Sequence, residues 1–153
     1  MAKTFSLQPL VLLAQKQNEA AIRKFGQLNL QQQAAQAKLE TLQQYRKDYQ
    51  EKLQQAEQNG ISQSELRNFQ NFILRLDEAI LQQRVKNEQA LNLLQLGRSE
   101  LQEAQRKMKS FDTLAERHIQ SELKLAAKSE QRLQDEHTGR ISSINASAAQ
   151  NEN

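Results

Sequence analysis

An unbroken row of apolar residues, one every seven positions, constrains the fold of this chain more than any other feature of its sequence. The row consists of Leu7, Ala14, Ala21, Leu28, Ala35, Leu42, Tyr49 and Ala56. A companion row, apolar in four of its seven positions, consists of Val11, Asn18, Phe25, Gln32, Leu39, Arg46 and Leu53. The alternating spacings of three and four residues are those of a coiled-coil seam. We therefore predict one long helix over about residues 7–58.

A turn and a second seam follow this helix. Gly60 can adopt the left-handed conformation that closes a helix, and Ser62 with Glu65 has the spacing of a capping box that opens the next one. The two rows of the second seam are Leu66, Ile73, Ile80, Asn87, Leu94, Leu101, Met108 and Ala115, and Phe69, Leu76, Gln83, Ala90, Gly97, Ala104 and Phe111. We predict a turn at 59–63 and a second helix over about 64–138, where Gly139 offers a stop.

The shortness of this turn brings the second helix back antiparallel against the first. The predicted fold is all-α, a long antiparallel two-helix coiled-coil hairpin that forms a single domain over residues 1–140. Position i then lies opposite a position near 121 minus i, so the second helix outruns the first and overhangs at its C-terminal end. The tail 141–153 is built of Ser, Asn, Ala and Gln, and we expect it to be disordered.

Composition argues against an enzyme. Only 37% of the 153 residues are hydrophobic and 5% aromatic, and four glycines and one proline cannot supply the turns of a sheet. The chain has no cysteine, no phosphate-binding loop and no histidine pair with metal-ligand spacing. We therefore predict no catalytic residues, no cofactor and no bound metal.

The distribution of charge and apolar residues also bears on partners. The net charge is +3, but basic and acidic side chains alternate along the chain and no segment is a basic tail. Aromatic residues are too sparse to stack on bases, so we do not expect nucleic-acid binding. The longest apolar run, 9–14, is far shorter than the roughly 20 residues that span a bilayer, so we expect a soluble chain with no direct membrane insertion.

One stripe of residues in the half of the hairpin near the turn is a candidate binding surface. Lys38, Leu42, Tyr45 and Tyr49 are spaced i, i+4, i+7 and i+11 on the first helix, and Phe72, Leu76, Ala79 and Gln83 repeat that spacing on the second. Tyr45 and Phe72 lie off the seam, so core packing does not explain them. They are either anchors for a partner or aromatics tolerated on the surface.

Several segments resemble the FliJ family of flagellar export proteins. The resemblance covers about residues 5–137, with the turn in the same place. It is carried by Tyr45-Arg-Lys-Asp-Tyr49, Asn59-Gly-Ile-Ser62, the run from Asn68 to Ile80 and the run from Lys107 to Arg117. The resemblance implies a stalk at the centre of the hexameric flagellar export ATPase, which promotes assembly of the ATPase and connects it to the cytoplasmic domain of the export gate.

The resemblance also implies site residues. The gate-binding surface of the family maps onto Leu42, Tyr45, Tyr49, Phe72, Leu76 and Ala79, which match. Lys38 and Gln83 stand where Gln and His are expected, so these two contacts are in doubt. The ATPase-facing part is placed at the opposite end of the hairpin, and its candidate residues are Leu10, Leu13, Phe25, Phe111, Leu114, His118 and Leu125.

A member of this family is expected in the cytoplasm, associated peripherally with the inner membrane at the export apparatus, where it could also meet export substrates or their chaperones. Two other readings stay open. The chain could be an injectisome stalk or a cytosolic escort for export substrates. The escort role predicts direct binding to unfolded filament-type subunits. It could also be a purely structural coiled coil, which predicts a stable self-dimer and no ATPase partner.

Overall fold

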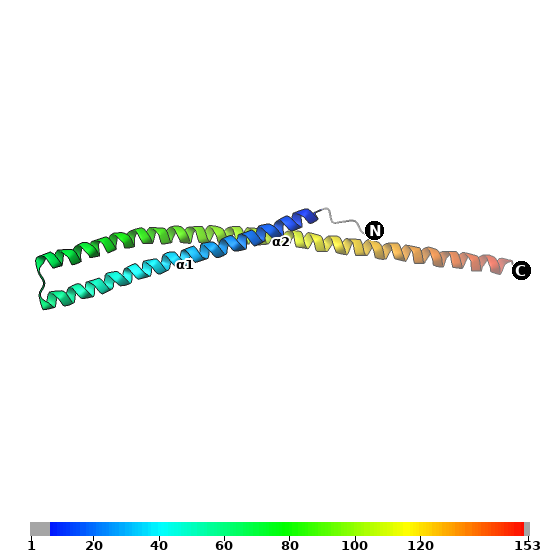
Figure 1. Ribbon diagram of the computed structural model, residues 1–153. Helices are drawn as coiled ribbons and strands as arrows, with labels where there is room; N and C mark the ends of the chain where they lie inside the picture. The colour runs from blue at the N-terminus through cyan, green and yellow to red at the C-terminus, as the bar shows by residue number, and fades with distance from the viewer. Residues whose placement is uncertain (1–6, 152–153) are drawn as a thin grey trace. The chain divides into compact units, whose positions relative to one another are not determined.

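The computed structural model describes residues 7–151, and nearly all of them lie in two helices. Helix α1 runs from Gln8 to Asn59 and helix α2 from Gln63 to Gln150, and no strand occurs within the described range. The two helices run antiparallel on either side of the turn (Figure 1). The predicted all-α helical hairpin is confirmed, and the boundaries of α1 agree with the prediction to within one residue.

The chain divides into two compact units. One unit is the hairpin formed by residues 16–105, and the other combines residues 1–15 with 106–153. Each unit is therefore a pairing of α1 with α2 over a different part of their length.

The core of the hairpin unit is the predicted seam. Its buried apolar side chains are Leu39, Leu53, Ile73, Leu76, Ile80 and Leu94, and the other seam positions between Asn18 and Ala104 are buried or half-buried. No residue is fully enclosed, since each helix can shield only one stripe of the other. Heptad spacing therefore identified correctly which face of each helix is covered.

Contacts across the seam confirm the predicted register. The pairs in contact are Tyr49 with Phe72, Ala35 with Gln83, Gln36 with Asn87, Arg46 with Asp77, and Lys24 with Glu100. Each pair lies within about one helical turn of the predicted position. Three of them involve polar seam residues, so these side chains are hydrogen-bonded across the helices and help to fix the register.

The turn between the helices has the predicted local chemistry. Gly60 has a φ of 82°, in the left-handed region where a side chain would be strained. The backbone N–H of Glu65 donates to Oγ of Ser62 at 3.2 Å, and the N–H of Leu66 donates to the Ser62 carbonyl at 3.0 Å. Ser62 is therefore the N-cap of α2.

Removing this cap is expected to weaken the hairpin. Ser62→Ala leaves the Glu65 N–H without its side-chain acceptor and should lower the free energy of unfolding by about 1 kcal/mol. Urea unfolding followed by circular dichroism measures the change. Ser64→Ala, one residue into the exposed first turn, is the control and should have little effect. Equal losses in both variants would contradict the capping role.

The other unit pairs the start of α1 with a later part of α2. Val11 and Ala14 are buried, and the seam residues Met108, Phe111 and Ala115 are half-buried. From Leu123 to the end of the described range every residue is exposed, so this part of α2 packs against no other segment of the described chain. The expected C-terminal overhang is present.

The end of α2 corrects the sequence prediction. Residues 139–150 are helical, so neither the predicted end near Thr138 nor the predicted disorder of 141–150 holds. Gly139 costs only about 1 kcal/mol inside a helix, a penalty too small to end α2 by itself. The Ser143 and Ser147 hydroxyls donate to carbonyls of the preceding turn, Arg140 and Ile144, so they do not compete with the helix for its backbone amides. The last two residues of the predicted tail lie outside the described range.

Candidate functional site

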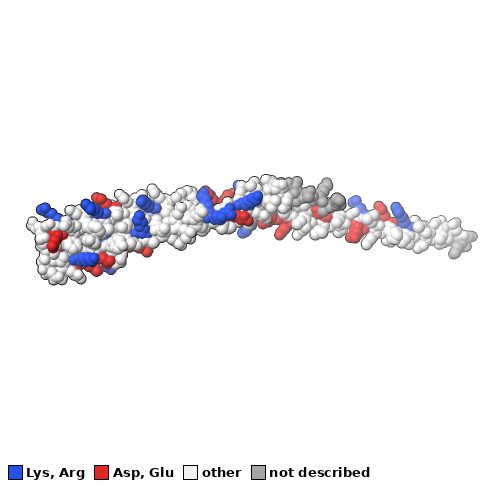
Figure 2. Space-filling model, viewed as in Figure 1, with Lys and Arg blue, Asp and Glu red and all other residues white. Residues whose placement is uncertain are grey.

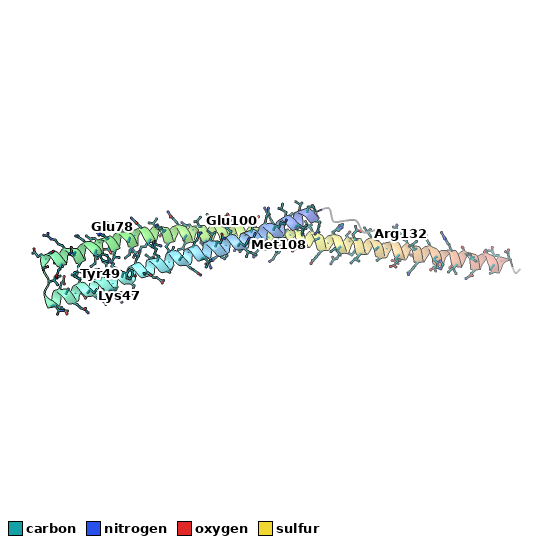
Figure 3. All side chains as sticks on the ribbon, in the orientation of Figure 1. Lys47, Tyr49, Glu78, Glu100, Met108 and Arg132 are labelled. Carbon is teal, nitrogen blue, oxygen red and sulfur yellow. The ribbon has the colours of Figure 1, made fainter. Side chains whose placement is uncertain are left out.

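Three aromatic rings form a cluster near the turn of the hairpin unit. The ring centroids of Tyr49 and Phe72 are 4.1 Å apart at an interplanar angle of 32°, and Phe69 meets Tyr49 edge to face at 5.8 Å. Nζ of Lys52 lies 5.5 Å from the Tyr49 centroid, within range of a cation–π contact. Figure 3 labels Tyr49 close to the turn, on the part of α1 that pairs with α2. The cluster bridges the two helices, because the Tyr49 ring of α1 contacts both phenylalanine rings of α2.

A shallow pocket opens over this cluster. It has a volume of about 370 Å³ and is lined by Tyr49, Glu65, Asn68, Phe69 and Phe72. The rings supply an apolar floor, while Glu65 and Asn68 add a carboxylate and an amide. A pocket with an aromatic floor and a few polar groups can receive an apolar side chain from a protein partner and orient it.

The structure places the predicted gate-binding residues at three depths. Tyr45 is 56% exposed and Phe72 is 38% exposed, so both rings are available to a partner. Leu42, Tyr49 and Ala79 are half-buried at the edge of the seam. Leu76 is buried between the helices and has little surface to offer.

The two predicted positions that depart from the family pattern also differ in depth. Lys38 is exposed. Gln83 is buried, and its Nε2 donates to the backbone carbonyl of Ala35 at 3.0 Å. Gln83 therefore ties α2 to α1 within the seam instead of presenting its amide at the surface.

The predicted ATPase-facing residues are divided between the two units. Leu10, Leu13, Leu114 and Leu125 are exposed and Phe111 and His118 are half-buried, all in the unit that contains both chain ends. Phe25 belongs to the hairpin unit, where the Arg98 guanidinium carbon lies 5.8 Å from its ring centroid. Six of the seven residues thus belong to one unit, and four of these expose leucine side chains.

Sequence reasoning missed part of the pocket. Phe69 was assigned to the seam, Glu65 only to the helix cap, and Asn68 and Lys52 to no site. The signal was present, because Phe69 and Phe72 are three residues apart and therefore neighbours on one face of α2. The sequence could not show that the Tyr49 ring of α1 packs against both of these rings.

The charges on the visible face of the hairpin alternate in sign, as the sequence predicted (Figure 2). Among the residues that the structure describes, no cluster of three or more metal-ligating side chains occurs. Within the same described range, neither helix contains an apolar stretch long enough to cross a membrane.

Comparison with known proteins identifies the family. The model of the flagellar FliJ protein family matches residues 3–147. The flagellar FliJ proteins of Salmonella typhi and Escherichia coli K12 are each 29% identical over 140 residues, covering 92% of this chain and 95% of the relative. No solved structure matches the chain. The long helical hairpin and the near-complete alignment lead to one conclusion: this chain belongs to the flagellar FliJ protein family.

Proposed function

We propose that this protein is a non-enzymatic stalk of the flagellar protein export apparatus, which binds at the centre of the export ATPase hexamer, promotes its assembly and connects it to the export gate. Family membership supports the assignment to flagellar export. On this proposal the protein acts on the cytoplasmic side of the inner membrane, as a peripheral component.

The observation that carries the proposal is the presence of two different exposed surfaces on a helical pair. The hairpin unit exposes Tyr45 and Phe72 beside the aromatic cluster. The other unit exposes several leucines. After residue 122, α2 packs against no other described segment of the chain. A protein that connects two partners needs two such surfaces. We assign the aromatic surface to the gate and the leucine surface to the ATPase.

The mixed charges of the helices suit this role. A slender helical pair with alternating signs can lie in a polar channel without a strong preference for one orientation. Exposed apolar side chains would then provide the specific contacts, since burial of apolar surface is the main favourable term in most protein association.

The proposal is tested by adding the purified chain to the export ATPase at a concentration too low for self-assembly, and measuring hydrolysis and sedimentation together. We expect faster hydrolysis together with ring-sized particles. The variant with Leu10, Leu13 and Leu114 changed to Gln should lose the effect. The matched control changes the exposed Leu30, Leu74 and Leu96 to Gln and should retain it. No change in either readout with the unaltered chain would contradict the stalk role.

A further inference from the structure

A second groove crosses the hairpin unit, formed by residues that the gate and ATPase assignments do not use. It has a volume of about 430 Å³, and its lining residues are Gln43, Arg46, Asp77, Ile80, Leu81 and Arg84. Ile80 is buried and forms the floor, while Leu81 is 61% exposed and forms part of the wall. Leu81, with the small exposed part of Ile80, therefore forms the apolar strip of the groove.

The groove and the aromatic surface lie on opposite flanks of the seam. In the heptad repeat, Tyr45 and Phe72 occupy the position preceding the first seam residue, whereas Gln43, Asp77 and Arg84 occupy the position following the second. In an antiparallel pair like positions of the two helices face each other, so each set forms its own edge of the seam. A partner on one edge leaves the other edge accessible.

The groove carries an excess positive charge. Arg46 is already occupied, since its Nε donates to Oδ1 of Asp77 across the seam. This hydrogen bond, together with the negative charge of Asp77, raises the pKa of Arg46. Arg84 is exposed and has no hydrogen bond or ion pair within the described part of the chain. The Arg84 guanidinium therefore lies beside the apolar strip of the groove, and its N–H groups are available to a partner.

We propose that this groove is a second docking surface of the hairpin, which binds an acidic amphipathic protein segment. An apolar side chain of the segment packs on Ile80 and Leu81, and a neighbouring carboxylate accepts hydrogen bonds from the Arg84 guanidinium. The planar guanidinium of Arg84 can bind both oxygens of a carboxylate at once, which makes the contact directional as well as electrostatic. The bound segment and the gate contact the hairpin on different edges, so both can be bound together.

The test measures binding of a fluorescent model peptide to the full chain by anisotropy. The probe is a helical peptide with leucines at i, i+3, i+4 and i+7 flanked by glutamates. Its two comparison peptides carry lysine in place of glutamate, or the same residues in scrambled order. We expect binding of the acidic amphipathic peptide only, and a loss of about tenfold in affinity for the variant that combines Leu81→Gln with Arg84→Gln.

Two further variants decide between a defined groove and general charge attraction. Leu74→Gln combined with Arg75→Gln removes the same residue types from exposed positions that do not line the groove, and should bind the peptide normally. Arg84→Glu should reverse the preference toward the lysine peptide. Equal binding of the scrambled peptide, equal losses in the two double variants, or no binding to the unaltered chain would each overturn the proposal.

Discussion

Replacing both Tyr45 and Phe72 by alanine is expected to weaken binding to the purified cytoplasmic domain of the export gate by about 30-fold or more, while leaving the helix content unchanged. Truncating a single aromatic anchor at a protein interface typically costs about 2 kcal/mol, which is about 30-fold in affinity, and the two substitutions together should reach at least this value. Tyr45 and Phe72 are the most exposed rings of the proposed gate surface, so their removal takes away contact area. Loss of the Phe72 ring contact with Tyr49 should also lower the free energy of unfolding, but the helices stay paired along the rest of the seam. Isothermal titration calorimetry measures the affinity, and circular dichroism measures the helix content.

The structure predicts a different result for Tyr49. Its ring packs against both Phe69 and Phe72, so Tyr49→Ala removes two ring contacts and should lower stability more than Phe72→Ala does, with each aromatic contact contributing about 0.5–1.5 kcal/mol. Tyr45→Phe is the conservative control and should bind nearly normally. If the double alanine variant lost helicity together with binding, the two rings would belong to the core and the docking assignment would be wrong.

Replacing Gly97 by leucine should destabilise the hairpin by about 2 kcal/mol, the usual cost of overfilling a packed site. Gly97 is buried at a close approach of the helices, where an added Cβ would lie 2.6 Å from Cδ1 of Leu28 and 4.0 Å from a ring carbon of Phe25. Leu28 could turn aside for a methyl group, but a full leucine side chain would force the helices apart. The neighbouring ion pair between Lys24 and Glu100, at 2.8 Å, would then be strained as well.

The same substitution at Gly26 should have the opposite sign. Gly26 lies in α1 with no atom within 4 Å of an added Cβ, so Gly26→Leu should stabilise the helix by about 0.8 kcal/mol through helix propensity alone. Both variants are compared by urea unfolding under identical conditions. Shifts of the same sign in the two variants would show that the close contact at Gly97 does not limit packing there.

The sequence was sufficient for most of the fold because the seam repeats every seven residues and local signals mark the turn. Ile73, Ile80 and Leu94 could be assigned to the core from spacing alone, since a helix places such residues on one face whatever its partner is. The left-handed Gly60 and the Ser62 cap were also recognisable, because both depend on interactions within a few residues. The end of α2 was not, because the helix-propensity cost of Gly139 and of several serines is too small to end a helix.

The candidate surfaces were predictable only in part. Tyr45 and Phe72 stood out as aromatics off the seam, and the structure exposes both. Gln83 belonged both to the seam and to the candidate stripe, and the structure buries it with its amide donating to the Ala35 carbonyl. Spacing says which side of a helix a residue occupies, but the depth of that residue depends on how closely the second helix approaches.

The sequence by itself therefore determined the antiparallel hairpin, its approximate register and the covered face of each helix, because these follow from periodicity and from a turn of a few residues. Only the tertiary structure decided the particular pairings. Arg46 binds Asp77, Arg84 has no ion pair or hydrogen bond among the described residues, and Leu28 packs against Gly97. These outcomes depend on distances of a few ångströms between side chains of different helices, which no pattern within one helix can specify.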